Sequence, residues 1–422
     1  MKNINKVAAV AVVAILLSGC AFAQGAFSVV PVPGSTPDSL IAINNDSFVV
    51  VNDANQLSVW SRISGTQSIG MNETNSGVAI NNSGEVVGAG NPGNSQTVQA
   101  FIWQPAGGLE WLSSLGGGLS AASGINDSNA VVGLSYTAAN QRHAFLWTAA
   151  SGMQDLTPAL TSTGGAAALA INAANQVVGY YFPNGSRNTL GFLWTQSGGL
   201  QNLGSAGTLA FAINDSGTVV GQTPIANDYR HAFSWTEAGG FVDLGTLGGV
   251  ESSALSVNSL GWIVGTSLTS NKNGLLHGFL WTPSNGMQSL DTLAHLTSKD
   301  QQTYSLQVND SGVVAISTNK GGFLLIPTMT PEIVSSLNPS ALGQPVTFTV
   351  TMTSIAGPPP DGETVQFSAG GTALGSATLT GGVAQFTTSS LPVGKNSVVA
   401  NYSGDANYVS AKSATLTQVV DQ

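Results

Sequence analysis

The sequence predicts an all-β fold, and three features support this prediction. A turn motif that begins with Asn occurs seven times between residues 44 and 309, at spacings of 37 to 51 residues. Short apolar or alternating runs separate the turns, without a helical period. After about residue 328 the repeat stops and a different alternating pattern begins. We therefore predict a seven-bladed β-propeller of four-stranded antiparallel blades over residues 24–327, closed by an N-terminal strand, and a β-sandwich over residues 328–422.

Residues 211–249 show the repeat unit most clearly. Four strands are expected, at residues 211–213, 218–222, 231–236 and 241–244. The turn Asn214-Asp215-Ser216-Gly217 joins the first two strands, and its Gly can take the positive φ that a tight turn needs. A polar loop over residues 223–229 joins the second and third strands. One unit of this kind forms a single antiparallel meander.

The same turn and the same aromatic strand recur along the chain. The turn begins at Asn44, Asn81, Asn126, Asn172, Asn214, Asn258 and Asn309. Three positions further on, six of the seven residues are Gly or Asn, the types that best tolerate a left-handed backbone, and the exception is Ser47. The third strand carries Trp60, Trp103, Trp147, Trp194, Trp235 and Trp281, with Leu325 in the seventh copy. We interpret this Trp row as core packing between neighbouring blades.

The two ends of the repeat array are irregular in complementary ways. The seventh unit stops after its third strand at Pro327, whereas residues 27–35 precede the first turn as a fourth strand precedes the next turn elsewhere. An open solenoid would instead need a polar capping unit at each end. We predict that residues 28–32 form the outer strand of the last blade, against residues 323–326.

Several repeated spellings resemble the bacterial extracellular HAF-repeat family. They are HAFLW at residues 143–147, HAFSW at 231–235, HGFLW at 277–281 and LGTLGG at 244–249. The resemblance covers most of the repeat array and implies an exported repeat protein, and the family supplies no catalytic residues. Where the motif has His, this chain has Gln56, Gln99, Leu190 and Gly321 in four copies.

Residues 1–23 have the features of a secretory signal peptide. Lys2 and Lys6 precede an apolar run over residues 7–17 that is too short to span a bilayer. The run ends in LSGC, which resembles a bacterial lipobox and predicts lipidation of Cys20. An A-x-A site before Gln24 is the alternative, and it would release a secreted protein. We expect an exported lipoprotein at the outer membrane or cell surface, in contact with the membrane only through this lipid anchor.

The composition agrees with export and excludes some partners. Cys20 is the only cysteine, so no intrachain disulfide can form. Without residues 1–23 the chain carries 9 basic and 21 acidic residues, a net charge near −12. A chain this acidic has no positive surface that would bind nucleic acid or an anionic membrane.

The C-terminal region has the alternation of half-buried strands. Apolar side chains alternate with Thr over residues 346–353, and a PPPDG turn follows. Further strands are expected at residues 363–367, 383–388, 397–402 and 414–420. The segment over residues 391–413 resembles the bacterial Ig-like repeat domains of exported proteins. This resemblance implies a spacer or an adhesive module built as an Ig-like β-sandwich.

Few residues suggest catalysis or metal binding. His143, His231 and His277 share one repeat position in three blades, so we interpret them as hydrogen-bond tethers within each blade. Hydrogen bonding inside the repeated turn accounts for the acids at Asp127, Asp215 and Asp310. The acids outside the repeat are interpreted as solvated loop charges; they are Glu73, Glu110, Asp228, Glu251 and Asp300. We expect no catalytic residues, metal or cofactor.

The loops between the second and third strands vary most, and loops on a rigid scaffold commonly carry binding specificity. Those of blades three to five contain Tyr136, Arg142, Tyr180, Tyr181, Arg187, Tyr229 and Arg230. Aromatic faces beside Arg suit sugars or anionic glycans. We therefore predict a surface-exposed binding or adhesion protein for a polysaccharide, a glycoconjugate or a surface protein. The alternatives are a glycan-cleaving hydrolase or lyase that uses the propeller cleft, and a cell-envelope scaffold.

Overall fold

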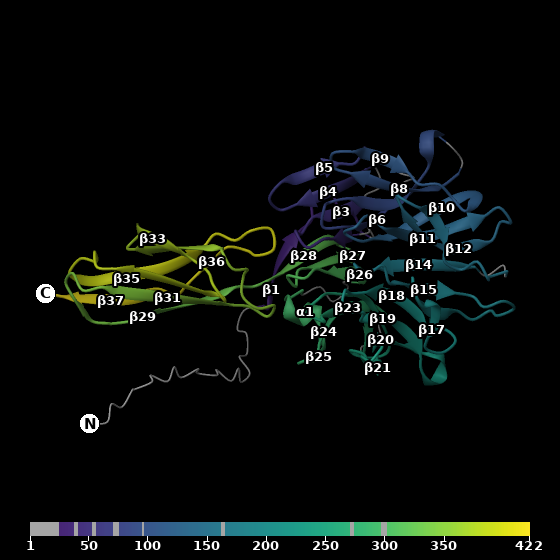
Figure 1. Ribbon diagram of the computed structural model, residues 1–422. Helices are drawn as coiled ribbons and strands as arrows, with labels where there is room; N and C mark the ends of the chain where they lie inside the picture. Colours follow the sequence, from purple (N-terminus) through teal and green to yellow (C-terminus); the bar gives the residue numbers. More distant parts are fainter. Residues whose placement is uncertain are drawn as a thin grey trace, which may run out of the picture.

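The computed structural model describes residues 25–37, 41–52, 56–70, 76–94, 97–161, 165–270, 274–296 and 302–422 (Figure 1). The expected signal peptide, Cys20, Glu73 and Asp300 lie outside the described residues. Within these ranges no helix is long and apolar enough to cross a membrane.

The repeat array folds into seven four-stranded antiparallel sheets, numbered here in chain order. Sheets 1 and 2 comprise β2 (Ile41–Ile43), β3 (Val49–Asn52), β4 (Leu57–Ser61), β5 (Gly65–Ser68), and β6 (Ser76–Ile80), β7 (Val86–Gly90), β8 (Gln99–Gln104), β9 (Gly108–Trp111). Sheets 3 and 4 comprise β10 (Gly116–Ile125), β11 (Val131–Thr137), β12 (Arg142–Thr148), β13 (Gly152–Asp155), and β14 (Ala166–Ile171), β15 (Val177–Tyr181), β16 (Leu190–Thr195), β17 (Gly199–Leu203). Sheets 5 and 6 comprise β18 (Leu209–Ile213), β19 (Val219–Pro224), β20 (Arg230–Thr236), β21 (Gly240–Asp243), and β22 (Gly248–Val257), β23 (Ile263–Thr269), β24 (Leu276–Thr282), β25 (Gly286–Ser289).

Sheet 7 is built from both ends of the array. Its strands are β26 (Thr303–Val308), β27 (Val314–Thr318), β28 (Gly321–Pro327) and the N-terminal β1 (Phe27–Pro31). β1 pairs antiparallel with β28, with Ser28 opposite Ile326 and Pro31 opposite Phe323. The predicted pairing of the N-terminal strand with residues 323–326 is therefore confirmed.

The strands expected from residues 211–249 agree with sheet 5 to within two residues at each end. Three short helical segments were not predicted, namely η1 (Pro92–Asn94), η2 (Ala226–Asp228) and α1 (Leu290–Leu293). The first two lie in loops between second and third strands. α1 follows sheet 6, and its Leu290 is fully buried in the core between sheets 6 and 7. A single turn of helix has too few residues to show a helical period in the sequence.

Neighbouring sheets pack through seven apolar clusters, each formed by two adjacent sheets. One of these clusters joins sheet 7 to sheet 1, through residues such as Leu324 and Val49. The Trp side chains of the third strand lie in the clusters, and five of the six are at most 9% exposed. Trp281, the sixth, packs half-buried against the cluster of sheets 5 and 6. The interpretation of the Trp row as packing between sheets is confirmed.

The repeated turns form a second set of links between sheets. The seven turn Asn residues are 3% to 7% exposed. Each Oδ1 accepts a hydrogen bond from the backbone N–H four residues further on. Each Nδ2 donates to the backbone carbonyl of the corresponding Asn in the next sheet, over 2.8 to 3.3 Å. The last link runs from Asn309 of sheet 7 to Asn44 of sheet 1, over 3.1 Å.

The acids in this turn have a role other than the one predicted. Asp127, Asp215 and Asp310 accept hydrogen bonds from backbone N–H groups of the preceding sheet, at 2.8 to 2.9 Å. The side chain that accepts hydrogen bonds inside the turn is that of the Asn. The prediction that the Asp side chains make these bonds was therefore wrong. The residues three positions after each Asn all have positive φ, including Ser47 at 55°. The left-handed position that the sequence indicated is therefore present in every copy.

The C-terminal region is a sandwich of two sheets. One sheet contains β29 (Thr330–Ser335), β31 (Val346–Thr353) and β34 (Val383–Thr388). The other contains β30 (Ser340–Ala341), β32 (Thr364–Ala369), β33 (Thr372–Thr378), β35 (Gly394–Tyr402), β36 (Ala411–Lys412) and β37 (Leu416–Asp421). Phe348, Val350 and Phe367 are fully buried between the sheets. β31 and β34 have the predicted bounds, whereas β29, β30, β33 and β36 were not predicted.

Candidate functional site

The predicted site residues lie at one end of the sheets. In each sheet the Asn turn joins the first and second strands, and the variable loop joins the second and third strands at the opposite end. We call these the Asn end and the loop end. The loop-end connections of sheets 3, 4 and 5 cover residues 138–141, 182–189 and 225–229.

Sheet 3 brings Tyr136 and Arg142 together. The two residues pair across the hairpin of β11 and β12. The Arg142 guanidinium lies 6.0 Å from the centre of the Tyr180 ring in sheet 4. A Cβ on Gly165 would come within 2.7 Å of the Arg142 Cβ, so this glycine gives Arg142 room beside sheet 4. Tyr136, Arg142 and Tyr180 thus form one half-buried group across the joint between sheets 3 and 4.

The other loop residues of sheet 4 extend this group. Tyr180 makes an edge-to-face contact with Phe182, with ring centres 6.2 Å apart. The Tyr181 hydroxyl donates to Asn202 Oδ1 over 2.7 Å. Arg187 is exposed in the loop that follows. The sheet therefore presents a fixed aromatic group and a cation that is open to solvent.

Sheet 5 places its two predicted residues differently. Tyr229 is 40% exposed at the end of its loop. Arg230 is half-buried, and its Nη1 donates to the carbonyl of Gly207 over 2.8 Å. Part of the Arg230 guanidinium thus holds the connection between sheets 4 and 5. Sequence reasoning, which treated Arg142 and Arg230 alike, missed this structural contact.

Three His–Asp pairs occur at the repeated His position. His143 Nδ1 lies 2.7 Å from Asp155, His231 Nδ1 lies 3.0 Å from Asp243, and His277 Nδ1 lies 2.6 Å from Asp291. The predicted tether within the sheet is confirmed for His143 and His231, and His277 is tethered to α1, which follows its sheet. The Asp partners were not predicted. A search for acids at a fixed distance after each His would have found two of them, because both follow the His by 12 residues.

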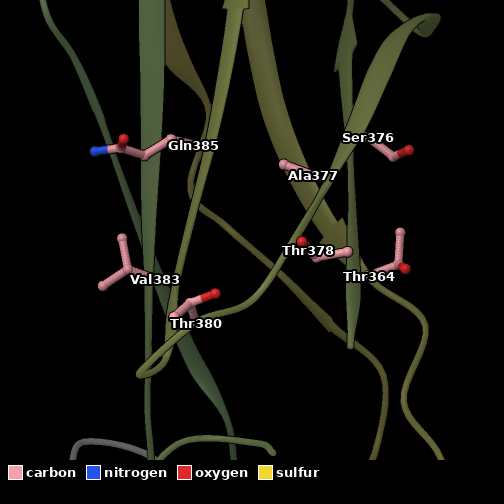
Figure 2. A pocket seen from close by; sticks show the side chains of 7 residues that line it. All are labelled: Thr364, Ser376, Ala377, Thr378, Thr380, Val383 and Gln385. Atoms are coloured by element: carbon pink, nitrogen blue, oxygen red, sulfur yellow. The ribbon is translucent and has the colours of Figure 1, made fainter. Parts of the chain in front are cut away.

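Two hollows lie away from the predicted residues. A cavity of about 200 Å³ at the Asn end is lined by turn residues from all seven sheets. A groove of about 690 Å³ crosses the sandwich, and Figure 2 shows Val383 and Gln385 on one side of it with Ser376 and Ala377 on the other. The groove is larger but open and lined mainly by hydroxyl and amide groups, so its size alone does not indicate a site.

The acids outside the repeat were interpreted as solvated loop charges, and three of them lie within the described residues. Glu110, Asp228 and Glu251 are exposed, in agreement with their interpretation as solvated charges. No group of three or more His, Cys, Asp or Glu side chains that could hold a metal ion occurs among the described residues.

Comparison with known proteins identifies one part of the chain. Residues 333–421 match the family model of the bacterial Ig-like domain (group 3), which confirms the resemblance inferred for the C-terminal region. No curated protein matches the chain. The resemblance of the seven repeats to the HAF-repeat family stays a prediction.

Among solved structures, the chain is similar to two structures of the extracellular domain of BT4673 from B. thetaiotaomicron. The first has 9% identity and a TM-score of 0.45 over 93% of this chain and 58% of that chain. The second has 10% identity and a TM-score of 0.47 over 94% and 59%. This chain therefore spans less than two thirds of those proteins. At these identities and TM-scores, the similarity carries no conclusion about what this chain binds.

Proposed function

We propose that the seven sheets form a closed seven-bladed β-propeller and that the chain is an exported, non-catalytic binding protein. Its ligand is a polysaccharide or glycoconjugate, and its binding surface is the loop end of sheets 3 to 5. The closed ring is supported by the pairing of β1 with β28 and by the contacts of the first strand of sheet 7 with that of sheet 1. The ring gives the loops a rigid support on which they can differ.

The observation that carries this proposal is the group of Tyr136, Arg142 and Tyr180. It joins two neighbouring sheets at the end where the loops differ, and its side chains are partly open to solvent. An aromatic ring can stack on the apolar face of a sugar, and a guanidinium can donate paired hydrogen bonds to a carboxylate or sulfate. These two properties together favour an anionic glycan over a neutral one.

Arg187 and Tyr229 provide the more exposed contacts of the same surface. The chain has only 11 Lys and Arg residues against 21 Asp and Glu, so the presence of Arg142 and Arg187 at the loop end of neighbouring sheets is distinctive. Because an acidic protein repels an anionic polymer at long range, binding must depend on close contacts at these Arg side chains. Their removal should therefore abolish binding.

The test is a glycan array that contains uronic acid polysaccharides, sulfated polysaccharides and neutral glucans, probed with residues 24–422. We expect binding to the anionic members. Arg142→Ala and Arg187→Ala should each weaken it by at least about tenfold, since a hydrogen bond to a charged group contributes about 1.5–3 kcal/mol and about 1.4 kcal/mol corresponds to a factor of ten. The triple change with Arg230→Ala should abolish it.

Lys320→Ala is the matched control, because Lys320 is an exposed cation at the loop end of sheet 7. It should leave binding unchanged. Binding that survives the triple change but disappears with removal of residues 328–422 would assign the activity to the Ig-like domain. Binding by none of the array members would contradict the glycan proposal.

Export and lipidation are part of the same proposal. The intact mass of the protein from the membrane fraction should correspond to a chain that begins at a lipid-modified Cys20. A soluble form that begins at Gln24 without lipid would replace the anchored protein by a secreted one.

A further inference from the structure

The Ig-like domain contacts sheets 6, 7 and 1 of the repeat array, and its polar contacts lie at the joint between sheet 7 and sheet 1. Figure 1 shows the sandwich beside β1 and β28. The loop over residues 403–410, between β35 and β36, makes the polar contacts. Its Asn407 donates from Nδ2 to the carbonyl of Asn45 in sheet 1, over 2.9 Å. Asn407 Oδ1 accepts from Ser47 Oγ of sheet 1 at 2.5 Å and from Asn309 Nδ2 of sheet 7 at 3.2 Å.

Ser47 distinguishes this joint from the others, because the other six sheets have Asn or Gly at the corresponding position. In sheets 3 and 4 the corresponding residues are Asn129 and Asn175, and their Oδ1 atoms accept from the turn Asn of the preceding sheet at 2.8 Å. Ser47 stands at the same left-handed position and offers only a hydroxyl, which lies 3.1 Å from Asn309 Nδ2. Asn407 supplies a further acceptor for Asn309 Nδ2, an amide oxygen that comes from another domain.

A cation of sheet 1 strengthens the contact. Arg62, in the turn after β4 of sheet 1, donates from Nη2 to the carbonyl of Tyr408 over 2.6 Å and also to the carbonyl of Asp405. The Tyr408 side chain is only 4% exposed in the core of the Ig-like domain, so the loop backbone that Arg62 bonds is fixed to that domain. The loop is thus anchored to sheet 1 through both its backbone and its side chains.

Apolar contacts cover the joint from both sides. Val409 packs against the cluster that sheets 7 and 1 share. Ala356, from another loop of the Ig-like domain, packs with Trp262 against the cluster of sheets 6 and 7. A Cβ on Gly312 would lie 2.8 Å from the Ala356 Cβ, so the turn of sheet 7 needs its glycine for this approach. The domain therefore contacts three consecutive sheets around the point where the two ends of the array meet.

We infer that the Ig-like domain acts as a clasp that holds sheet 7 against sheet 1. At the other six joints the last strand of one sheet leads along the chain into the first strand of the next. Here the chain that leads into sheet 1 comes from β1, and β1 is held to β28 by strand pairing. The direct contacts of β26 to β28 with sheet 1 join residues more than 260 positions apart, so the chain does little to keep these strands together and an added contact should have its largest effect here. The inference is independent of the glycan proposal, because it concerns the opposite end of the sheets.

The test is amide hydrogen exchange of the full chain, compared between sheets 1, 7 and 4. Asn407→Ala should speed exchange of β2 and β26 by at least about tenfold, because it removes three hydrogen bonds whose net contributions are each about 0.5–1.5 kcal/mol. β14 and β15, in the distant sheet 4, should exchange as before. Asn401→Ala, a change of the same type on β35, is the control and should alter none of these rates.

A second variant tests whether an amide oxygen from sheet 1 can replace the one that Asn407 supplies to Asn309 Nδ2. Ser47→Asn in the Asn407→Ala chain restores the residue type found at Asn129, and it should return β2 and β26 close to their original rates. Unchanged exchange in sheets 1 and 7 after both Asn407→Ala and Arg62→Ala would overturn the inference. Equal acceleration in sheet 4, or failure of Ser47→Asn to restore protection, would also overturn it.

Discussion

The Asn end and the loop end of the seven sheets are built on opposite principles. At the Asn end the same buried amide recurs seven times and bonds the next sheet, so the turns cannot vary without loss of a buried hydrogen bond. At the loop end the connections differ in length and sequence, and their side chains are exposed or half-buried. The difference indicates that one end holds the array together, which leaves the other end free to bind. Each prediction below tests one side of this comparison.

Removal of residues 26–33 should have the largest effect. It deletes β1, which supplies the buried Phe27 and leaves β28 without its outer neighbour. Burial of one large apolar side chain contributes about 1.5–3 kcal/mol, and the strand pairing with β28 is lost as well. We therefore expect the free energy of unfolding to fall by more than about 4 kcal/mol. Urea unfolding should show a far greater decrease than removal of residues 328–422. A comparable decrease for the two deletions would contradict the role assigned to β1.

Asn172→Ala should have the next largest effect. Asn172 is 3% exposed and bonds both its own turn and the carbonyl of Asn214. Groups left unsatisfied in a buried site cost about 1–3 kcal/mol each, so a loss of about 2–4 kcal/mol is expected in urea unfolding. Asn188→Ala changes an exposed Asn at the loop end of the same sheet and should stay within about 0.5 kcal/mol. Similar losses for both variants would remove the distinction between the ends.

The His–Asp pairs allow a comparison at one repeat position. His143 is 3% exposed, whereas the side chains of His231 and Asp243 are 18% and 55% exposed. Because solvent weakens an exposed pair, His143→Ala should lower the melting temperature more than His231→Ala. A larger decrease for His231→Ala would show that the pairs do not act as tethers in proportion to their burial.

A smaller, pH-dependent effect is expected at Glu363 in the Ig-like domain. Burial and the neighbouring Asp405 raise the pKa of the Glu363 carboxyl above its usual 4.5. A raised pKa means that its contribution to stability is fully present below pH 4.5 and is lost as pH rises through the higher folded value. Glu363→Gln should therefore raise the melting temperature slightly at pH 7 and leave it nearly unchanged at pH 4. A decrease at pH 7 would show that the ionised carboxylate stabilises the domain.

Local patterns predicted the parts of the fold that depend on neighbours in sequence. The Asn turn, the Trp strand and the alternation of residues 346–353 each follow from a short period, and the structure has all three. The pairing of β1 was predictable because a missing strand at one end matched an extra strand at the other. The contacts of Asn407 were not predictable, because residues 47 and 407 meet only through the packing of two domains.

The sequence predicted where the candidate site lies, but it did not predict which side chains contact one another there. The variability of the loops indicated the loop end, and the sequence placed Arg142, Arg187 and Arg230 there. It could not show that Arg142 lies over Tyr180 or that Arg230 bonds Gly207, because both contacts cross from one sheet to another. Side-chain contacts between repeats depend on how the sheets stack, which no single repeat specifies.

The most direct test of the division between the two ends measures glycan binding and thermal stability on the same two variants. Arg142→Ala with Arg187→Ala should weaken binding to the anionic glycan identified on the array by at least about a hundredfold and should lower the melting temperature only slightly. Asn172→Ala should lower the melting temperature strongly and, at a temperature where it is folded, should bind that glycan as the unchanged protein does. Loss of binding in folded Asn172→Ala, with retention in the double Arg variant, would contradict the account.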